Sequence, residues 1–142
     1  MSGAVLVAYA TKKGSTQEVA EAVAEVLRER GLEVELRAAR EVEDVSAYAG
    51  VVVGGALYTG RWHRDARRLL RRHRAALATL PVAVFAMGPK TAEPNDLARA
   101  REQLDRHLNK VPEVEPVAVG IFGGVVDPAK LRFPFNLSLI HI

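Results

Sequence analysis

The chain has 142 residues, 49% of them hydrophobic, which is enough for one domain with a proper core. It contains no cysteine, so disulfides, thiolate metal sites and cysteine nucleophiles are excluded. The net charge of +3 is modestly basic, and no apolar stretch approaches the roughly 20 residues of a membrane span. The first residues also lack the charged-then-apolar pattern of a signal peptide, and we expect a cytoplasmic protein.

The first predicted element is a strand over residues 5–9, an unbroken apolar run typical of a strand buried on both faces. A polar, glycine-containing turn follows, and apolar residues then recur at helical spacing. The start of such a helix offers free N–H groups and a positive dipole end, which suit a phosphate. Ser15 and Glu18 also fit a capping box, which needs no ligand.

Further strands alternate with amphipathic helices along the rest of the chain. The predicted strands span residues 5–9, 32–36, 50–55, 81–87 and 116–122. The first predicted helix ends near residue 30, and two others span residues 62–80 and 95–108. A turn or brief helix is expected within residues 40–48. Such alternation predicts a parallel sheet with helices on both faces. We therefore predict an α/β fold, a doubly wound five-stranded parallel sheet of order 2-1-3-4-5.

In this strand order, ligands bind where the first and third strands end. The turns expected there, residues 10–16, 54–62 and 87–91, all contain glycine and small or hydroxyl residues, which favours a phosphate. A G-x-G-x-x-G fingerprint and a P-loop motif are absent, which argues against a dinucleotide site and a P-loop NTPase. A phospho-acceptor receiver domain needs an aspartate at the position of Gly54, which argues against that class of protein. The four histidines lack metal-ligand spacing, so we expect no metal site.

The segment Thr11-Lys12-Lys13-Gly14-Ser15-Thr16, preceded by Tyr9, fits the pattern [ST]-x-x-G-x-T and resembles the phosphate loop of the flavodoxin family. This resemblance extends over residues 4–124. Residues 54–63 and 122–133 are similar to the menaquinone-dependent protoporphyrinogen IX dehydrogenase type within that family. This second resemblance implies an FMN-binding oxidoreductase that oxidises protoporphyrinogen IX with a quinone as acceptor. A non-enzymatic FMN electron-transfer flavodoxin, with a redox protein as partner, is the alternative.

The resemblance also assigns cofactor-binding roles, and it implies no catalytic or metal-ligating residue. The FMN phosphate would be held by Thr11, Lys12, Lys13, Gly14, Ser15 and Thr16. The flavin ring would be lined on one side by Ala56, Leu57, Tyr58, Thr59, Gly60 and Trp62, and on the other by Gly88, Pro89 and Lys90. Trp62 equally suits a core position at the start of a helix, and Lys90 an exposed position in a loop.

The helix predicted over residues 62–80 is strongly basic. Helical spacing places in one stripe Arg64, Arg67, Arg68, Arg71 and Arg72. Such a stripe is most often a solvated face, and the alternatives are an anionic membrane surface, an acidic redox partner and nucleic acid. We expect no nucleic-acid partner. Through this stripe, a cytoplasmic protein would contact the inner face of the cell membrane peripherally.

The end of the chain departs from the predicted fold. Residues 1–142 read as a single flavodoxin-like domain, in which a last helix should return to cover the first strand. Residues 125–142 do not resemble that helix, because Pro128 and Pro134 interrupt them. We therefore expect this C-terminal segment to be incomplete and the last helix to be missing.

Overall fold

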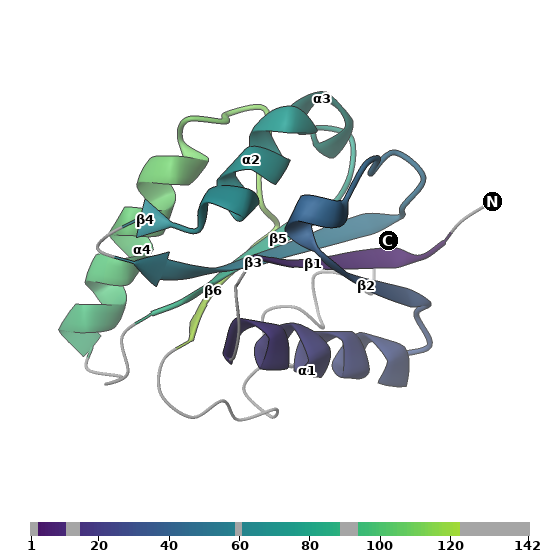
Figure 1. Ribbon diagram of the computed structural model, residues 1–142, viewed down its shortest axis with the longest axis horizontal. Coiled ribbons are helices and arrows are strands. Elements are labelled where there is room, and N and C mark those ends of the chain that lie inside the picture. The colour runs from purple at the N-terminus through teal and green to yellow at the C-terminus, as the bar shows by residue number, and fades with distance from the viewer. Residues whose placement is uncertain (1–2, 11–14, 59–60, 89–93, 123–142) are drawn as a thin grey trace.

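The computed structural model describes residues 3–10, 15–58, 61–88 and 94–122 (Figure 1). The strands are β1 (Val5–Ala10), β2 (Val34–Ala38), β3 (Gly50–Tyr58), β4 (Arg61–Trp62), β5 (Val82–Met87) and β6 (Ala118–Phe122). The helices are α1 (Ser15–Glu29), the 3₁₀ helix η1 (Ala39–Glu41), α2 (Arg64–Arg72), α3 (Arg74–Leu77) and α4 (Pro94–Leu108). The predicted incomplete segment, residues 125–142, lies outside the described residues.

The sheet confirms the predicted α/β class and topology. Its strands run in the order β2-β1-β3-β5-β6, all pairs on this path being parallel. This is the predicted order 2-1-3-4-5 once the short β4 is set aside, because β4 pairs only with β3 and is antiparallel to it. A parallel sheet of this kind needs helices on both faces to bury its apolar strands.

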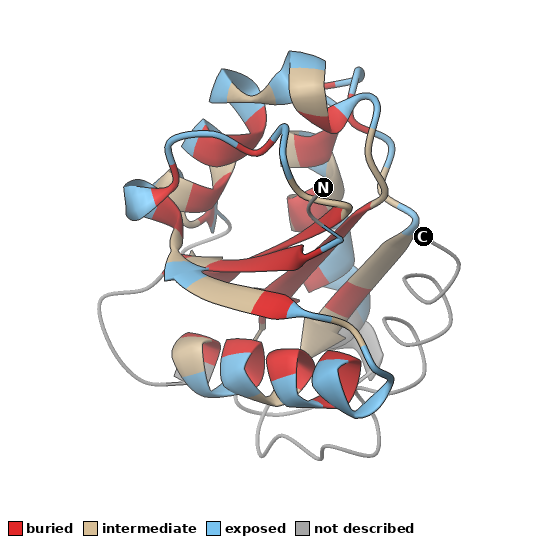
Figure 2. Cartoon of the chain, turned by 90° about the vertical axis from the view of Figure 1, so that its right-hand side faces the viewer, coloured by how far each residue is buried: buried red, intermediate tan, exposed pale blue. Residues whose placement is uncertain are grey.

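Two hydrophobic layers flank the sheet. Helix α1 covers one face, and α2, α3 and α4 lie on the other (Figure 1). Side chains alternate across each strand, so Val5 and Val7 of β1 face α1, whereas Leu6 and Ala8 contribute to the opposite layer. All four are completely buried, as predicted for a strand covered on both sides. Figure 2 shows that buried residues fill the central part of the sheet.

Helix α1 ends at the glycine that the sequence indicates. Gly31 has a φ of 85°, a left-handed conformation that glycine adopts without steric cost. Its N–H donates to Arg28 O at 2.9 Å, and the Leu32 N–H donates to Leu27 O at 3.1 Å. This pair of bonds is a Schellman motif, which satisfies the last carbonyls of the helix and turns the chain toward β2.

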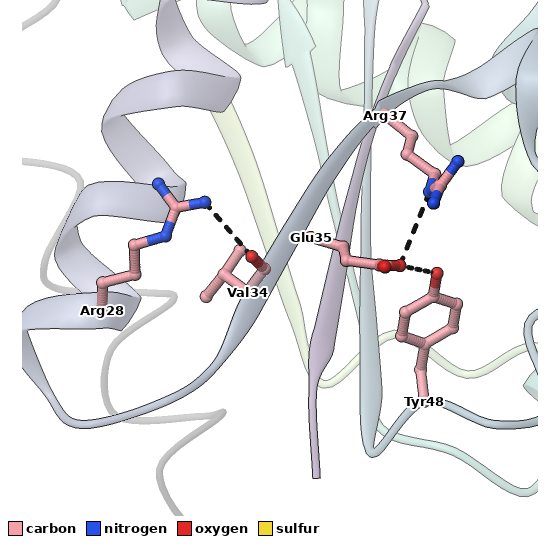
Figure 3. A network of polar contacts seen from close by, with 5 residues as sticks. All are labelled: Arg28, Val34, Glu35, Arg37 and Tyr48. Carbon is pink, nitrogen blue, oxygen red and sulfur yellow. Dashed lines mark hydrogen bonds and ion pairs between the residues drawn. The ribbon is translucent and has the colours of Figure 1, made fainter. Parts of the chain in front are cut away.

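The edge strand β2 is fixed by side chains on both sides (Figure 3). Arg28 Nη2 donates to Val34 O at 3.1 Å. Glu35 accepts a hydrogen bond from the Tyr48 hydroxyl and lies 3.5 Å from Arg37 Nε. The Tyr48 hydroxyl and then Arg37 lower the pKa of Glu35, so the carboxylate is the form that this network stabilises.

The prediction of one helix over residues 62–80 is wrong. Residues 61–62 form β4, and helical structure begins at Arg64 and is divided at His73, where the backbone adopts φ −107° and ψ 19°. The start is set by His63, whose Nδ1 accepts the Asp65 N–H at 3.0 Å and so caps the helix. A capping histidine carries no strong sequence signal, because Ser, Thr, Asp and Asn are the usual caps.

Among the described residues, no helix is both long enough and apolar enough to cross a membrane. The same residues contain no group of three or more His, Asp or Glu side chains that could hold a metal ion.

Candidate functional site

The candidate site lies at the carboxyl edge of the sheet, where three neighbouring strands end. Ala10 of β1 is opposite Gly55 of β3, which is opposite Ala86 of β5. Each of these strands leads into one of the three turns that the sequence predicted to meet. Beyond Met87, the Gly88 N–H donates to Phe122 O at 2.7 Å, which aligns the end of β5 with the end of β6.

The phosphate end of the predicted site is built on the start of α1. Ser15 is its first residue, and Thr16 is buried in its first turn with 2% of its surface exposed. Thr16 is the one buried polar side chain among the described residues. A helix N-terminus with a buried hydroxyl beside it can receive an anionic group, so these residues fit a phosphate. The other predicted members, Thr11, Lys12, Lys13 and Gly14, lie outside the described residues.

The second predicted turn is partly a β-hairpin. The sequence indicated a loop from Ala56, whereas β3 continues to Tyr58 and pairs with β4 through Leu57↔Trp62 and Tyr58↔Arg61. The His63 N–H donates to Ala56 O at 2.8 Å and closes the hairpin at its base. Ala56 is buried and Leu57 half-buried. Thr59 and Gly60 lie outside the described residues.

Trp62 lies in the hydrophobic core between the sheet and α2. Its side chain is fully buried, and its Nε1 donates to Phe85 O at 3.2 Å. This burial favours the core alternative for Trp62, and its flavin contact stays a prediction. The hydrophobic pattern did not separate the two, since a Trp at a helix start suits both.

Arg67 supports the hairpin, a role that sequence reasoning missed. Its Nε donates to Trp62 O at 2.9 Å, so this half-buried side chain ties α2 to β4. The remaining arginines of the predicted stripe, Arg64, Arg68, Arg71 and Arg72, are exposed. The stripe is therefore a solvent-facing surface from which Arg67 is withdrawn.

The third predicted turn begins at Gly88, which is half-buried. A Cβ on this residue would lie 3.3 Å from Ile121 Cγ2 and 3.6 Å from Ala100 Cβ, so β6 and α4 pack closely around it. The other two predicted members of this side, Pro89 and Lys90, lie outside the described residues.

Comparison with known proteins gives the family. The flavodoxin domain model matches residues 6–137. The protoporphyrinogen IX dehydrogenase [quinone] of Escherichia coli strain K12 is 24% identical over 139 residues, which are 95% of this chain and 77% of that protein.

Solved structures agree with the fold. A flavodoxin from the domain Archaea has a TM-score of 0.70 at 14% identity, covering 96% of this chain and 94% of that one. Rubredoxin oxygen:oxidoreductase from Desulfovibrio gigas has a TM-score of 0.73 at 15% identity, covering 97% of this chain and 35% of that one. FMN, predicted from the phosphate loop, is the cofactor that the family implies. The chain belongs to the flavodoxin domain family.

Proposed function

We propose that this protein is an FMN-dependent oxidoreductase that takes electrons from protoporphyrinogen IX and passes them to a quinone. The observation that carries the proposal is the 24% identity to the protoporphyrinogen IX dehydrogenase [quinone] of Escherichia coli, which extends over 95% of the chain. The resemblance of residues 54–63 and 122–133 to that group of proteins supports it independently of the fold.

The bound flavin would supply the electron-transfer chemistry, while the protein binds and orients it. The start of α1 with Thr16 would hold the phosphate, and the turns after β1, β3 and β5 would surround the ring. Ala56, Leu57 and Tyr58 would form one wall as strand residues, which gives that wall a fixed backbone. The remaining members of the proposed set are Thr11, Lys12, Lys13, Gly14, Ser15, Thr59, Gly60, Trp62, Gly88, Pro89 and Lys90.

Positive charge favours this acceptor and substrate class. Arg61 is exposed in β4, beside the proposed ring wall, and exposed arginines continue along α2. Protoporphyrinogen carries propionate groups, which such a surface attracts. Quinones reside in membranes, and a basic surface gains about 1 kcal/mol per Lys or Arg placed close to anionic lipid. These arginines would therefore bring the protein to the inner face of the membrane.

A non-enzymatic FMN electron carrier is the second candidate. The likeness to a flavodoxin along 96% of the chain favours it. The two candidates differ in reduction potential. Positive charge around a flavin stabilises its reduced, anionic form, and about 1.4 kcal/mol corresponds to roughly 60 mV for one electron. The dehydrogenase is expected to be less reducing than the carrier.

The deciding experiment is anaerobic turnover. Purified protein loaded with FMN is mixed with protoporphyrinogen IX and a soluble menaquinone analogue, and porphyrin formation is followed by fluorescence. Free FMN at equal concentration is the control for uncatalysed oxidation. Protein-dependent porphyrin formation that requires the quinone supports the dehydrogenase. Reduction of the flavin by a flavodoxin reductase at a strongly negative potential, without porphyrin formation, supports the carrier and contradicts the leading proposal.

A further inference from the structure

A second polar pocket lies away from the cofactor site, between η1 and α2. Helix α2 contributes Asp65, Arg68 and Arg72 to its wall, η1 contributes Arg40, and His73 follows α2 directly. The remainder of the lining is apolar and consists of Ala39 of η1, Val42 directly after η1, and Leu69 of α2. Side chains from two segments at least 23 residues apart in sequence thus surround one small space.

Helical geometry explains how α2 supplies its part. Arg68 and Arg72 are four residues apart and Asp65 is three residues before Arg68, so all three project from the same face. Leu69, beside them, is buried with 3% of its surface exposed and anchors this face on the core. Arg40 is brought opposite by η1, which begins directly after the edge strand β2.

Arginines outnumber carboxylates in the lining of this pocket. Among the described ion pairs, none involves Arg40, Arg68 or Arg72. The Asp65 carboxylate lies 4.0 Å from His63 Nδ1. Burial and then the neighbouring Arg72 lower the pKa of His73, so its imidazole is neutral near pH 7. The lining itself carries three guanidinium groups and one carboxylate, a net charge near +2, and the Asp44 carboxylate outside the lining interacts electrostatically with His73.

We propose that this pocket binds a phosphate group carried by a molecule other than FMN. A phosphate monoester carries about −1.5 to −2 charges at pH 7, which matches the excess charge, whereas a single carboxylate leaves part of it unpaired. The planar guanidinium fork binds phosphate oxygens in pairs, which a lysine ammonium does not. Arg40, Arg68 and Arg72 would enclose the phosphate from two elements.

The pocket is distinct from the site proposed for FMN. The FMN phosphate is assigned to the start of α1, and α1 and α2 cover opposite faces of the sheet (Figure 1). One molecule of FMN therefore leaves this pocket accessible. The phosphate could belong to a soluble ester or to a lipid headgroup, and the same guanidinium contacts serve either source.

The test is a titration of FMN-saturated protein with glycerol 3-phosphate at fixed ionic strength. The Nε–H signals of arginine are followed by ¹H–¹⁵N NMR. We expect saturable shifts of Arg40, Arg68 and Arg72, and at least about a tenfold weaker affinity in Arg68→Gln and Arg72→Gln, since each loses a charge-assisted contact. Arg64→Gln is the matched control: it removes the same charge from the same helix, outside the pocket. It should stay within about twofold of the wild type.

Equal weakening by Arg64→Gln and Arg68→Gln would show general charge attraction and overturn the proposal, as would the absence of saturable shifts. Vesicles of phosphatidic acid in phosphatidylcholine distinguish a lipid headgroup from a soluble phosphate ester as the source of the phosphate. Co-sedimentation that is lost in Arg68→Gln, kept in Arg64→Gln and competed by glycerol 3-phosphate supports a lipid headgroup. Saturable binding of the soluble ester without co-sedimentation supports a free phosphate ester.

Discussion

The ring of Phe85 lies directly against Gly54, so a Cβ on that glycine would come within 1.9 Å of Phe85 Cζ. The two residues are opposite each other in neighbouring strands of the sheet, β3 and β5. Phe85 is fully buried, and its ring centroid lies 5.8 Å from that of Phe122 in β6. The absence of a side chain at position 54 therefore makes room for an aromatic ring at the centre of the sheet.

Gly54→Ala should destabilise the protein by about 1–3 kcal/mol or more, because the buried ring has to move. Urea unfolding measures the change. Gly3→Ala is the control, since a Cβ at position 3 meets nothing within 4 Å. Combining Gly54→Ala with Phe85→Leu should recover part of the loss relative to the sum of the two single changes. Additive effects would show that the ring and the glycine are not coupled.

Trp62→Phe should destabilise the protein by about 1–3 kcal/mol, because the buried Phe85 carbonyl loses its indole donor. Urea unfolding again provides the measurement. Since Trp62 is the sole tryptophan of the chain, its fluorescence reports on this position alone. Acrylamide should quench the emission of the native apoprotein far less than that of the unfolded chain. Strong quenching in the native state would contradict the buried position.

Tyr48→Phe should raise the pKa of Glu35 toward its ordinary value, because the Tyr48 hydroxyl is the main cause of its lowering. Glu35 has a depressed pKa in the folded state, so its stabilising effect is present above the unfolded pKa and is lost as pH falls through the folded pKa. In the variant, this loss should occur at higher pH. NMR titration of the Glu35 carboxyl carbon measures the shift.

Asp44 is the internal control for that titration. The backbone N–H and then the hydroxyl of Ser46 lower its pKa, so Tyr48→Phe should leave it unchanged. Parallel movement of both carboxyl groups would indicate a general change in the region and not the loss of one hydrogen bond.

Thr16→Ala should weaken the binding of FMN by roughly tenfold or more, whereas the binding of riboflavin should change little. A lost hydrogen bond to a charged group costs about 1.5–3 kcal/mol. Riboflavin has no phosphate and therefore does not make this hydrogen bond. Fluorescence titration of both ligands gives the two dissociation constants. Thr16→Ser keeps the hydroxyl and should retain most of the FMN affinity. An equal loss for both ligands would place the phosphate elsewhere.

His107→Leu should make stability less dependent on pH below neutrality. Burial, followed by Arg67 and Lys110, lowers the pKa of His107, and its Nδ1 has no hydrogen-bond partner among the described residues. The unfolded chain takes up the proton more readily, so the wild type loses stability as pH falls below the unfolded pKa of about 6.5. Urea unfolding at pH 7.5 and 5.5 compares the two proteins, and an equal loss in both would exclude His107 as a cause.

The sequence alone determined the fold class, because strand and helix periodicities are local properties. The apolar run of β1, the glycine that ends α1 and the alternation of elements were sufficient for the class, and their spacing suited the strand order that the structure shows. The motif from Thr11 to Thr16 also predicts where the phosphate end of the candidate site lies. Each of these features depends on neighbours in the chain, so each can be read without contacts at long range.

Only the tertiary structure decided what the side chains after β3 do. The continuation of β3 and the burial of Trp62 result from pairing with β4 and from the Phe85 carbonyl, which is 23 residues away. The withdrawal of Arg67 from the arginine stripe, and the meeting of Arg40 with Arg68 and Arg72, likewise depend on how α2 packs. Helical spacing fixes which residues share a face, but packing against distant segments decides which of them reach solvent, a backbone carbonyl or a pocket.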